Sequence, residues 1–155
     1  MNEILKKEIE SLIKELNLKC SIEKFQDKIS IDHKTNWLYW TIDQKLSYIK
    51  ENSVPYELVD DCIIAYKSTR DDGYSAYNFQ YKYEVGKTYE SHCDCNSNEE
   101  NSFGLSAWTK EEALYYHSKG ELYKVKIAID DIGCFVHNNN KIRCHKLTVL
   151  KKINF

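Results

Sequence analysis

Residues that interrupt regular structure are scarce in this sequence, which has one proline and five glycines among 155 residues. Linkers and disordered chains are usually richer in both, so we expect a packed protein. A run of about 18 apolar residues, the minimum for a transmembrane helix, is also missing. Charged residues crowd positions 3–8, where a secretory signal peptide would begin its apolar stretch, and we therefore expect a cytoplasmic protein.

The signature motifs of several enzyme classes are missing as well. The chain has no P-loop, no Gly-x-Gly-x-x-Gly and no Gly-x-Ser-x-Gly. An excess of positive charge is also absent, because the net charge is −2 and the isoelectric point is about 6.2. These absences argue against the enzymes that carry such motifs and against a protein that binds nucleic acid over its whole surface.

Two amphipathic helices are predicted near the N-terminus. Residues 2–18 place Ile and Leu at the 3.6-residue period with Lys and Glu opposite, which is typical of a helix that packs on its own domain; a dimer helix or a partner-binding arm is the alternative. Residues 42–51 follow Thr41, which we expect to cap the helix, with Gln44 at the reciprocal position of a capping box.

Pro55 marks a change of pattern from period 3.6 to period two. We therefore divide the chain into a helical part, 1–55, and a β-rich domain, 56–155, which we expect to form one compact unit. One helix, at about 110–118, is predicted inside the β-rich domain, after Thr109 as N-cap. The predicted fold class is α+β, with N-terminal helices followed by a mostly antiparallel sheet.

Alternation of apolar and polar residues predicts the strands of that sheet. The predicted strands are 62–67, 81–85, 88–89, 104–108, 122–129 and 141–153. In the last of these, the apolar parity shifts near His145, which predicts a bulge or a bend there. Residues 91–102 are polar and are predicted to form an exposed loop.

Cysteines are numerous, and four of the six suggest a metal site. His92, Cys93 and Cys95 place three soft ligands within four positions, and further Cys and His residues lie at 134–145. In an extended strand, the two cysteines of Cys-x-Cys would lie about 7 Å apart, so a turn at Asp94 would be needed to bring both to one ion. The candidate zinc ligands are Cys93, Cys95, Cys134 and Cys144; the alternative is free cysteines in a reducing cytosol.

A catalytic pair of Cys and His is a separate question. His92–Cys93 and Cys144–His145 are adjacent in sequence, and adjacent residues on a strand point to opposite faces. Neither pair is therefore predicted to form a nucleophile with its base.

Aromatic residues are the most unusual feature of the composition, with twelve Tyr, three Trp and five Phe. Most of those on predicted strands are expected to pack within the sheet. Two groups beside loops are predicted to contact a protein partner, because Tyr and Trp bury a large area at low entropic cost. With two neighbouring acids, the candidate binding residues are Trp37, Tyr39, Trp40, Asp71, Asp72, Tyr74 and Tyr77.

Four segments of the β-rich half, within about 65–152, carry a resemblance to a known family. The segments are Ala65–Lys67, Phe79–Glu90, Gly104–Tyr116 and the pair Val125–Ile127 with Lys141–Leu147. Together they resemble an uncharacterised domain found in phage and prophage proteins. This resemblance implies a mobile-element origin and a bacterial cytoplasm, and it implies no activity.

A glycine, a short strand and a helix, at 104–118, also resemble part of ADP-ribosyltransferase-like folds. That resemblance implies NAD as cofactor and a cleft lined by Tyr66, Trp108 and Tyr116. The last strand, 141–153, has no acid where such enzymes hold the ribose hydroxyl.

Charge is distributed unevenly along the chain: residues 56–101 carry −6, whereas residues 119–155 carry +5. The acidic stretches at 57–61, 71–72 and 94–100 could mimic nucleic acid or dock on a basic protein. We therefore predict a phage-encoded inhibitor of a host protein or defence complex, of the anti-CRISPR or counter-defence type, with no cofactor, no membrane and no direct nucleic-acid contact. The alternatives are an ADP-ribosyltransferase-like enzyme using NAD and a zinc-stabilised nucleic-acid-binding domain.

Overall fold

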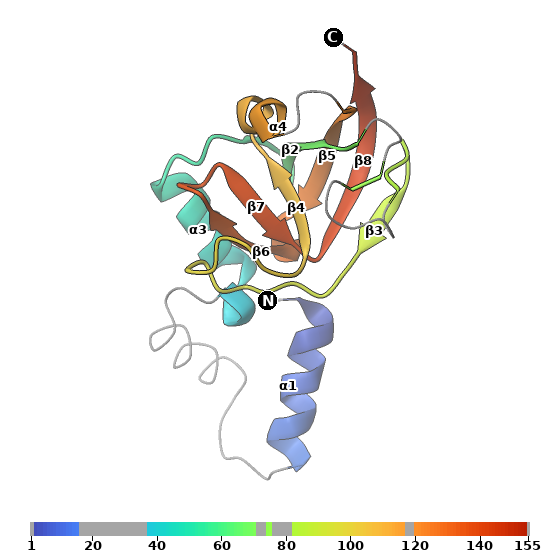
Figure 1. The fold of residues 1–155 in the computed structure, drawn as a ribbon. Helices are drawn as coiled ribbons and strands as arrows, with labels where there is room; N and C mark the ends of the chain where they lie inside the picture. Colours follow the sequence, from blue (N-terminus) through green and yellow to red (C-terminus); the bar gives the residue numbers. More distant parts are fainter. Residues whose placement is uncertain (1, 16–36, 71–73, 76–81, 117–119, 155) are drawn as a thin grey trace.

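The computed structural model describes residues 2–15, 37–70, 74–75, 82–116 and 120–154 (Figure 1). The helical elements are α1 (Glu3–Glu15), η1 (Trp37–Tyr39), α3 (Ile42–Glu51), α4 (Lys110–Tyr116) and η2 (Ile129–Asp131). The strands are β1 (Glu57–Val59), β2 (Cys62–Ser68), β3 (Thr88–Glu90), β4 (Leu105–Trp108), β5 (Leu122–Ala128), β6 (Ile132–Val136), β7 (Lys141–Cys144) and β8 (Lys146–Ile153). The predicted α+β class is confirmed.

All the strands belong to one sheet in which every pairing is antiparallel, in the order β3-β8-β5-β2-β4-β7-β6. The central strand, β2, pairs along its whole length with β5. Its other edge is shared, because β1 pairs with Cys62–Ile64 and β4 meets it at Tyr66. This division lets β4, β7 and β6 continue the sheet past the end of β1.

One hydrophobic cluster joins the N-terminal elements to the sheet. Trp37 of η1 and Ile49 of α3 are buried with side chains of β2, β5, β6, β7 and β8. A second, smaller cluster lies under α4, where Ala113 packs with Trp108 and Leu122. The helical and β-rich parts of the chain therefore share their main core.

The second helix begins and ends where the sequence predicted. It spans Ile42–Glu51, and Thr41 Oγ1 accepts from the Gln44 N–H at 3.2 Å while Gln44 Oε1 accepts from the Thr41 N–H at 2.8 Å. The bend predicted near His145 is also confirmed, because this residue separates β7 from β8.

Two predictions about the strands are wrong or incomplete. Residues 83–85, expected within a strand at 81–85, form no strand, and the Tyr89 hydroxyl supplies a local partner by accepting from the Glu84 N–H at 2.8 Å. The predicted strands also omit β1 and β6; all five residues of β6 are buried, and such a strand shows no alternation.

The first helix projects from one end of the sheet, with its N-terminal turn nearest the strands (Figure 1). Ile9 is buried, but Ile4 and Leu12 on the apolar side remain 71% and 52% exposed. The predicted continuation of this helix to residue 18 lies outside the described residues. None of the helices in the described part of the chain is long and apolar enough to cross a membrane.

Candidate metal centre

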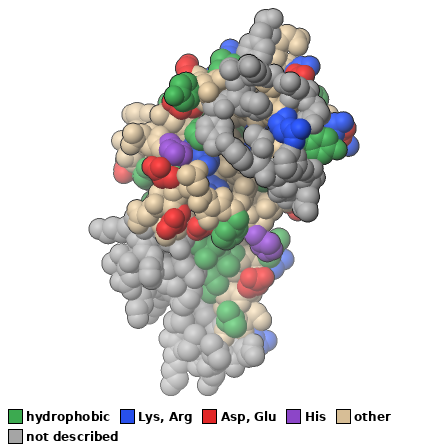
Figure 2. Space-filling view, in the orientation of Figure 1, with side chains coloured by type: hydrophobic (Ala, Val, Ile, Leu, Met, Phe, Trp, Pro, Cys, Tyr) green, Lys and Arg blue, Asp and Glu red, His purple; other side chains and the backbone are tan. Residues whose placement is uncertain are grey.

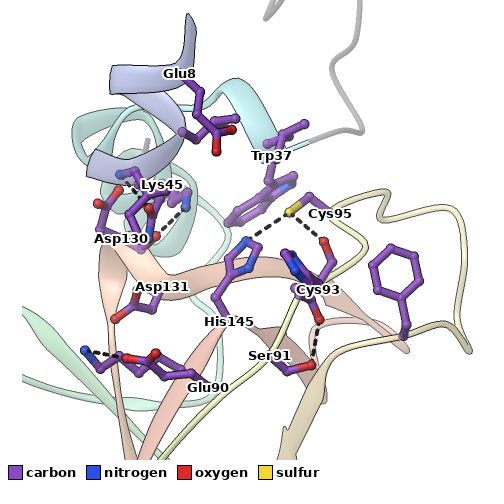
Figure 3. A pocket seen from close by; sticks show the side chains of 17 residues that line it. Glu8, Trp37, Lys45, Glu90, Ser91, Cys93, Cys95, Asp130, Asp131 and His145 are labelled. Carbon is purple, nitrogen blue, oxygen red and sulfur yellow. Dashed lines mark hydrogen bonds and ion pairs between the residues drawn. The ribbon is translucent and has the colours of Figure 1, made fainter.

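A cavity of about 810 Å³ lies between the N-terminal end of α1 and the sheet. Its walls come from α1, η1, α3, the segment after β3, η2 and the break between β7 and β8 (Figure 3). Hydrophobic side chains gather where the end of α1 meets the sheet (Figure 2), and Phe103, which lines the cavity, is 62% exposed. The cavity lining thus mixes apolar side chains, such as Ile4 and Phe103, with polar groups from the sheet side and with Glu8 of α1.

The segment between β3 and β4 carries two of the polar groups, Cys93 and Cys95. This segment has no helix or strand, and its conformation depends on hydrogen bonds from other elements. The guanidinium of Arg143, fully buried in β7, donates to three main-chain carbonyls of this segment, those of Asp94, Asn96 and Glu99. The Trp37 N–H donates to the Cys95 carbonyl at 3.0 Å. These bonds turn both thiols inward, and Cys93 and Cys95 are 8% and 4% exposed.

Two glycines make room for the Cys93 sulfur. A Cβ added at Gly133, in β6, would lie 2.3 Å from Cys93 Sγ. A Cβ added at Gly104 would lie 3.1 Å from the same atom, and Gly104 has a φ of +131°, which L side chains rarely adopt. The Cys93 sulfur therefore occupies a space that exists because both positions lack a side chain.

The third polar group, His145, enters the cavity from the break between β7 and β8. The backbone N–H of His145 donates to the Asp131 carbonyl at 2.8 Å, and this bond fixes the break between the strands against η2. The imidazole Nε2 lies 3.5 Å from Cys95 Sγ (Figure 3). The bend predicted from the sequence thus aims His145 at a cysteine fifty positions earlier in the chain.

The geometry of these three residues suits a metal ion. Cys93 Sγ, Cys95 Sγ and a ring nitrogen of His145 all lie within 4.8 Å of one another. Tetrahedral zinc with bonds of about 2.3 Å to sulfur and about 2.1 Å to nitrogen requires a sulfur–nitrogen edge of about 3.6 Å. The observed 3.5 Å between Cys95 Sγ and His145 Nε2 matches that edge.

The two thiols hold their protons very differently. The hydrogen bond from Cys93 lowers the pKa of the Cys95 thiol, and the hydrogen bond and charge of His145 lower it further. The same hydrogen bond, together with burial, raises the pKa of the Cys93 thiol. The pair therefore favours one thiolate that a neighbouring thiol stabilises.

A lysine and two aspartates lie beside the histidine on the side away from the cysteines (Figure 3). Lys45 is 3% exposed, and its Nζ donates to the carbonyls of Asp130 at 3.0 Å and Ile132 at 2.7 Å. Burial lowers the Lys45 pKa and raises the Asp131 pKa. The cavity therefore places a fixed amine and a carboxyl group beside the three candidate ligands.

The other two predicted zinc ligands lie outside this group. Cys134 Sγ accepts from Arg143 Nη1 at 3.4 Å, and burial raises the Cys134 pKa to about 11. Cys144 is fully buried in the sheet, where burial raises its pKa to about 12. The structure thus joins Cys93 and Cys95 to His145.

The described side chains of the predicted contact cluster around Trp37 are one buried and one half-buried tryptophan. Trp37 is 2% exposed and stacks on the half-buried Trp40, with ring centroids 4.4 Å apart. Tyr74 is half-buried, and Lys82 Nζ lies 5.7 Å from the centre of its ring. The remaining members lie outside the described residues or have undescribed side chains: Tyr39, Asp71, Asp72 and Tyr77.

The residues proposed to line a nicotinamide cleft are packed against neighbours. Trp108 is 7% exposed, stacks on His137 with centroids 5.5 Å apart, and has Lys141 Nζ 5.0 Å from its ring centre. Tyr66 pairs with Trp108 across β2 and β4 and packs into the cluster under α4. The side chain of Tyr116 is outside the described part. The cavity beside α1 is lined by neither Tyr66 nor Trp108.

His145 is the site residue that sequence reasoning missed as a partner of Cys95. The argument against Cys144–His145 concerned neighbours on one strand, and it could not reveal a contact across the fold. A usable signal was present, because the parity shift near His145 marks a break that frees its side chain from the sheet. Comparison of the chain with protein-family models, curated proteins and solved structures gave no match.

Proposed function

We propose that the protein binds a zinc ion through Cys93, Cys95 and His145 and uses it for hydrolysis of a ligand in the adjoining cavity. The observation that carries this proposal is the meeting of three ligand atoms, all within 4.8 Å of one another, in the wall of a cavity of about 810 Å³.

The ligand chemistry favours zinc over the hard cations. Thiolate and imidazole are soft or borderline ligands, whereas Mg²⁺ and Ca²⁺ prefer oxygen. Cys93 and Cys95 would supply two thiolates and His145 a neutral ring nitrogen, which together balance the charge of a divalent ion. The His145 N–H bond to Asp131 and the Arg143 bonds to the loop fix the backbone that carries these ligands.

The number of ligands favours a reactive ion over a purely structural one. Structural zinc sites are closed by four protein ligands, whereas catalytic sites have three protein ligands and an open position. The group formed by the described residues has three members, and all three line the cavity. Zinc at such a position lowers the pKa of a bound water to about 7.

The surrounding residues of the chain have defined roles in this proposal. The Lys45 amine, fixed by two carbonyls, is placed to stabilise negative charge on a bound ligand. The exposed apolar side chains of Ile4 and Phe103, which line the cavity, would contact an apolar part of a bound ligand. The substrate therefore combines an apolar part with a group that zinc and an amine can polarise.

Metal content of single variants tests the ligand set. Full-length protein loaded with zinc and dialysed should retain one ion per chain, and Cys95→Ser or His145→Gln should lose it or bind at least tenfold more weakly. Cys62→Ser, at a half-buried position at the start of β2, is the matched control and should retain the ion. Cys134→Ser and Cys144→Ser should also retain it, and loss of zinc from these two variants together with retention in His145→Gln would contradict the proposed ligands.

The open position is tested separately with cobalt. Co²⁺ in a thiolate site absorbs visible light, and this absorption changes when a further ligand binds the ion. We expect imidazole or azide added to the Co²⁺ protein to change the spectrum at constant metal content. An unchanged spectrum would show a closed, structural site and would contradict hydrolysis while leaving metal binding intact.

A further inference from the structure

A second hollow, of about 370 Å³, lies on the other side of α3 from the buried Lys45 and Ile49. The described residues that line it are Trp40, Asp43, Gln44, Ser47, Tyr48 and Glu51. None of these residues lines the cavity beside α1, so the two hollows are separate.

Two aromatic rings form fixed walls of this hollow. The ring centroids of Trp40 and Tyr48 are 6.0 Å apart, with planes inclined by 61°. Trp37 stacks behind Trp40, and Phe135 stacks on Tyr48 with centroids 5.9 Å apart. The Tyr48 hydroxyl also donates to Asn139 Oδ1 at 2.8 Å. The two rings are therefore held in place before any ligand arrives.

The charge of the hollow is negative. Asp43 and Glu51 are the charged residues among the described lining, and both are exposed. They are eight positions apart on α3, with Ser47 midway, so the three lie along one side of the helix. Glu51 is in the last turn, where the helix dipole adds to its negative potential. Aromatic walls flanked by carboxylates are a typical environment for an organic cation.

We propose that this hollow binds the guanidinium group of an arginine side chain presented by a protein partner. A guanidinium is planar, so it can stack on Trp40 or Tyr48 while its N–H groups reach a carboxylate. An ammonium group lacks that planar face, and arginine is a common anchor residue at protein interfaces. None of the candidate metal ligands lines this hollow, and either proposal can fail without the other.

NMR titration of the full chain with N-acetyl-arginine amide tests the assignment. We expect saturable shifts at Trp40, Tyr48 and the α3 amides, with a dissociation constant on the order of 1 mM. N-acetyl-citrulline amide has nearly the same shape without the charge, and it should bind at least tenfold more weakly.

Two double variants with the same change in net charge complete the test. Asp43→Asn with Glu51→Gln should weaken arginine binding at least tenfold, and circular dichroism checks that the fold is retained. Glu57→Gln with Asp60→Asn, which alters two exposed acids near β1, should leave binding within twofold. Equal loss in both double variants, equal binding of citrulline, or tighter binding of choline than of arginine would overturn the proposal.

Discussion

Gly133 is the residue at which the smallest change should disturb the candidate metal centre. Its position in β6 faces Cys93, and a Cβ there would lie 2.3 Å from the cysteine sulfur and 3.0 Å from the Arg143 carbonyl. Neither neighbour can move freely, because the carbonyl is backbone within the sheet and the sulfur lies between two glycines. The site therefore depends on a residue that supplies no ligand.

Gly133→Ala should lower the free energy of unfolding by about 1–3 kcal/mol, as expected for overpacking, and should weaken zinc binding. Urea unfolding and metal titration measure the two effects. Gly86→Ala is the control: its added Cβ meets nothing within 4 Å, but the residue has a φ of +86°. We expect this control to lose about 1 kcal/mol of stability through backbone strain and to bind zinc normally. Equal zinc affinity in the two variants would contradict the role of Gly133.

Lys67 has a buried amine that lines neither of the two hollows. Its Nζ donates to the Ser106 carbonyl at 2.6 Å and lies 4.8 Å from the centre of the Tyr83 ring. Burial lowers its pKa to about 8 from the ordinary 10.5. Because the unfolded chain binds the proton more tightly, this residue makes the folded state relatively more stable as the pH rises from 8 towards 10.5.

Lys67→Met should therefore have a pH-dependent effect on stability. The unfolding free energy of the variant minus that of the wild type should fall by about 2 kcal/mol between pH 7 and about pH 9.5, because the wild type alone gains from losing the buried charge. Urea unfolding of both proteins at the two pH values measures this difference, in which the titration of the cysteines cancels. A difference that is constant with pH would show that Lys67 has an ordinary pKa.

At the scale of the elements, the segment between β3 and β4 depends for its order on a distant side chain. Arg143 donates from β7 to carbonyls spread over residues 94–99, and its planar fork reaches several of them at once. A lysine could reach fewer. The placement of Cys93 and Cys95 follows from these bonds as much as from their own sequence.

Arg143→Lys should lower the free energy of unfolding by about 2 kcal/mol and should speed amide exchange in residues 94–99 more than in β2 or β5. The zinc affinity should fall with the order of this segment. Lys151→Met, at an exposed position of β8, is the control and should change neither quantity. Uniformly faster exchange throughout the sheet would indicate a general loss of stability instead.

Local signals predicted the elements that carry their own pattern. The helix α3 has a capping box and a 3.6-residue period, and both its ends were predicted. The strand β6 is buried along its whole length, so it has no alternation to detect. Residues 83–85 alternate as a strand does, yet the Tyr89 hydroxyl supplies a bond that a neighbouring strand would otherwise provide. The errors therefore arise where burial along a whole strand removes the alternation, or where a nearby side chain replaces the bond to a neighbouring strand.

At the scale of the whole molecule, the candidate site was likewise predictable where a local pattern marks a residue and unpredictable where residues meet across the fold. The sequence singled out Cys93 and Cys95 from their spacing and His145 as a bend, but their contact depends on strands paired across the chain. No local sequence pattern predicts that the side chain of His145 contacts Cys95. The phage origin and the inhibitor function inferred from the sequence stay predictions, and the hollow proposed to bind arginine would give a partner protein a specific place to dock.

The most direct test of the account is zinc K-edge X-ray absorption of the full-length protein loaded with one equivalent of zinc. The account predicts two sulfur neighbours at about 2.3 Å, one imidazole nitrogen at about 2.1 Å and one further light atom from solvent or a ligand. Four sulfur neighbours, as expected for Cys93, Cys95, Cys134 and Cys144, or an ion bound by oxygen alone would contradict it.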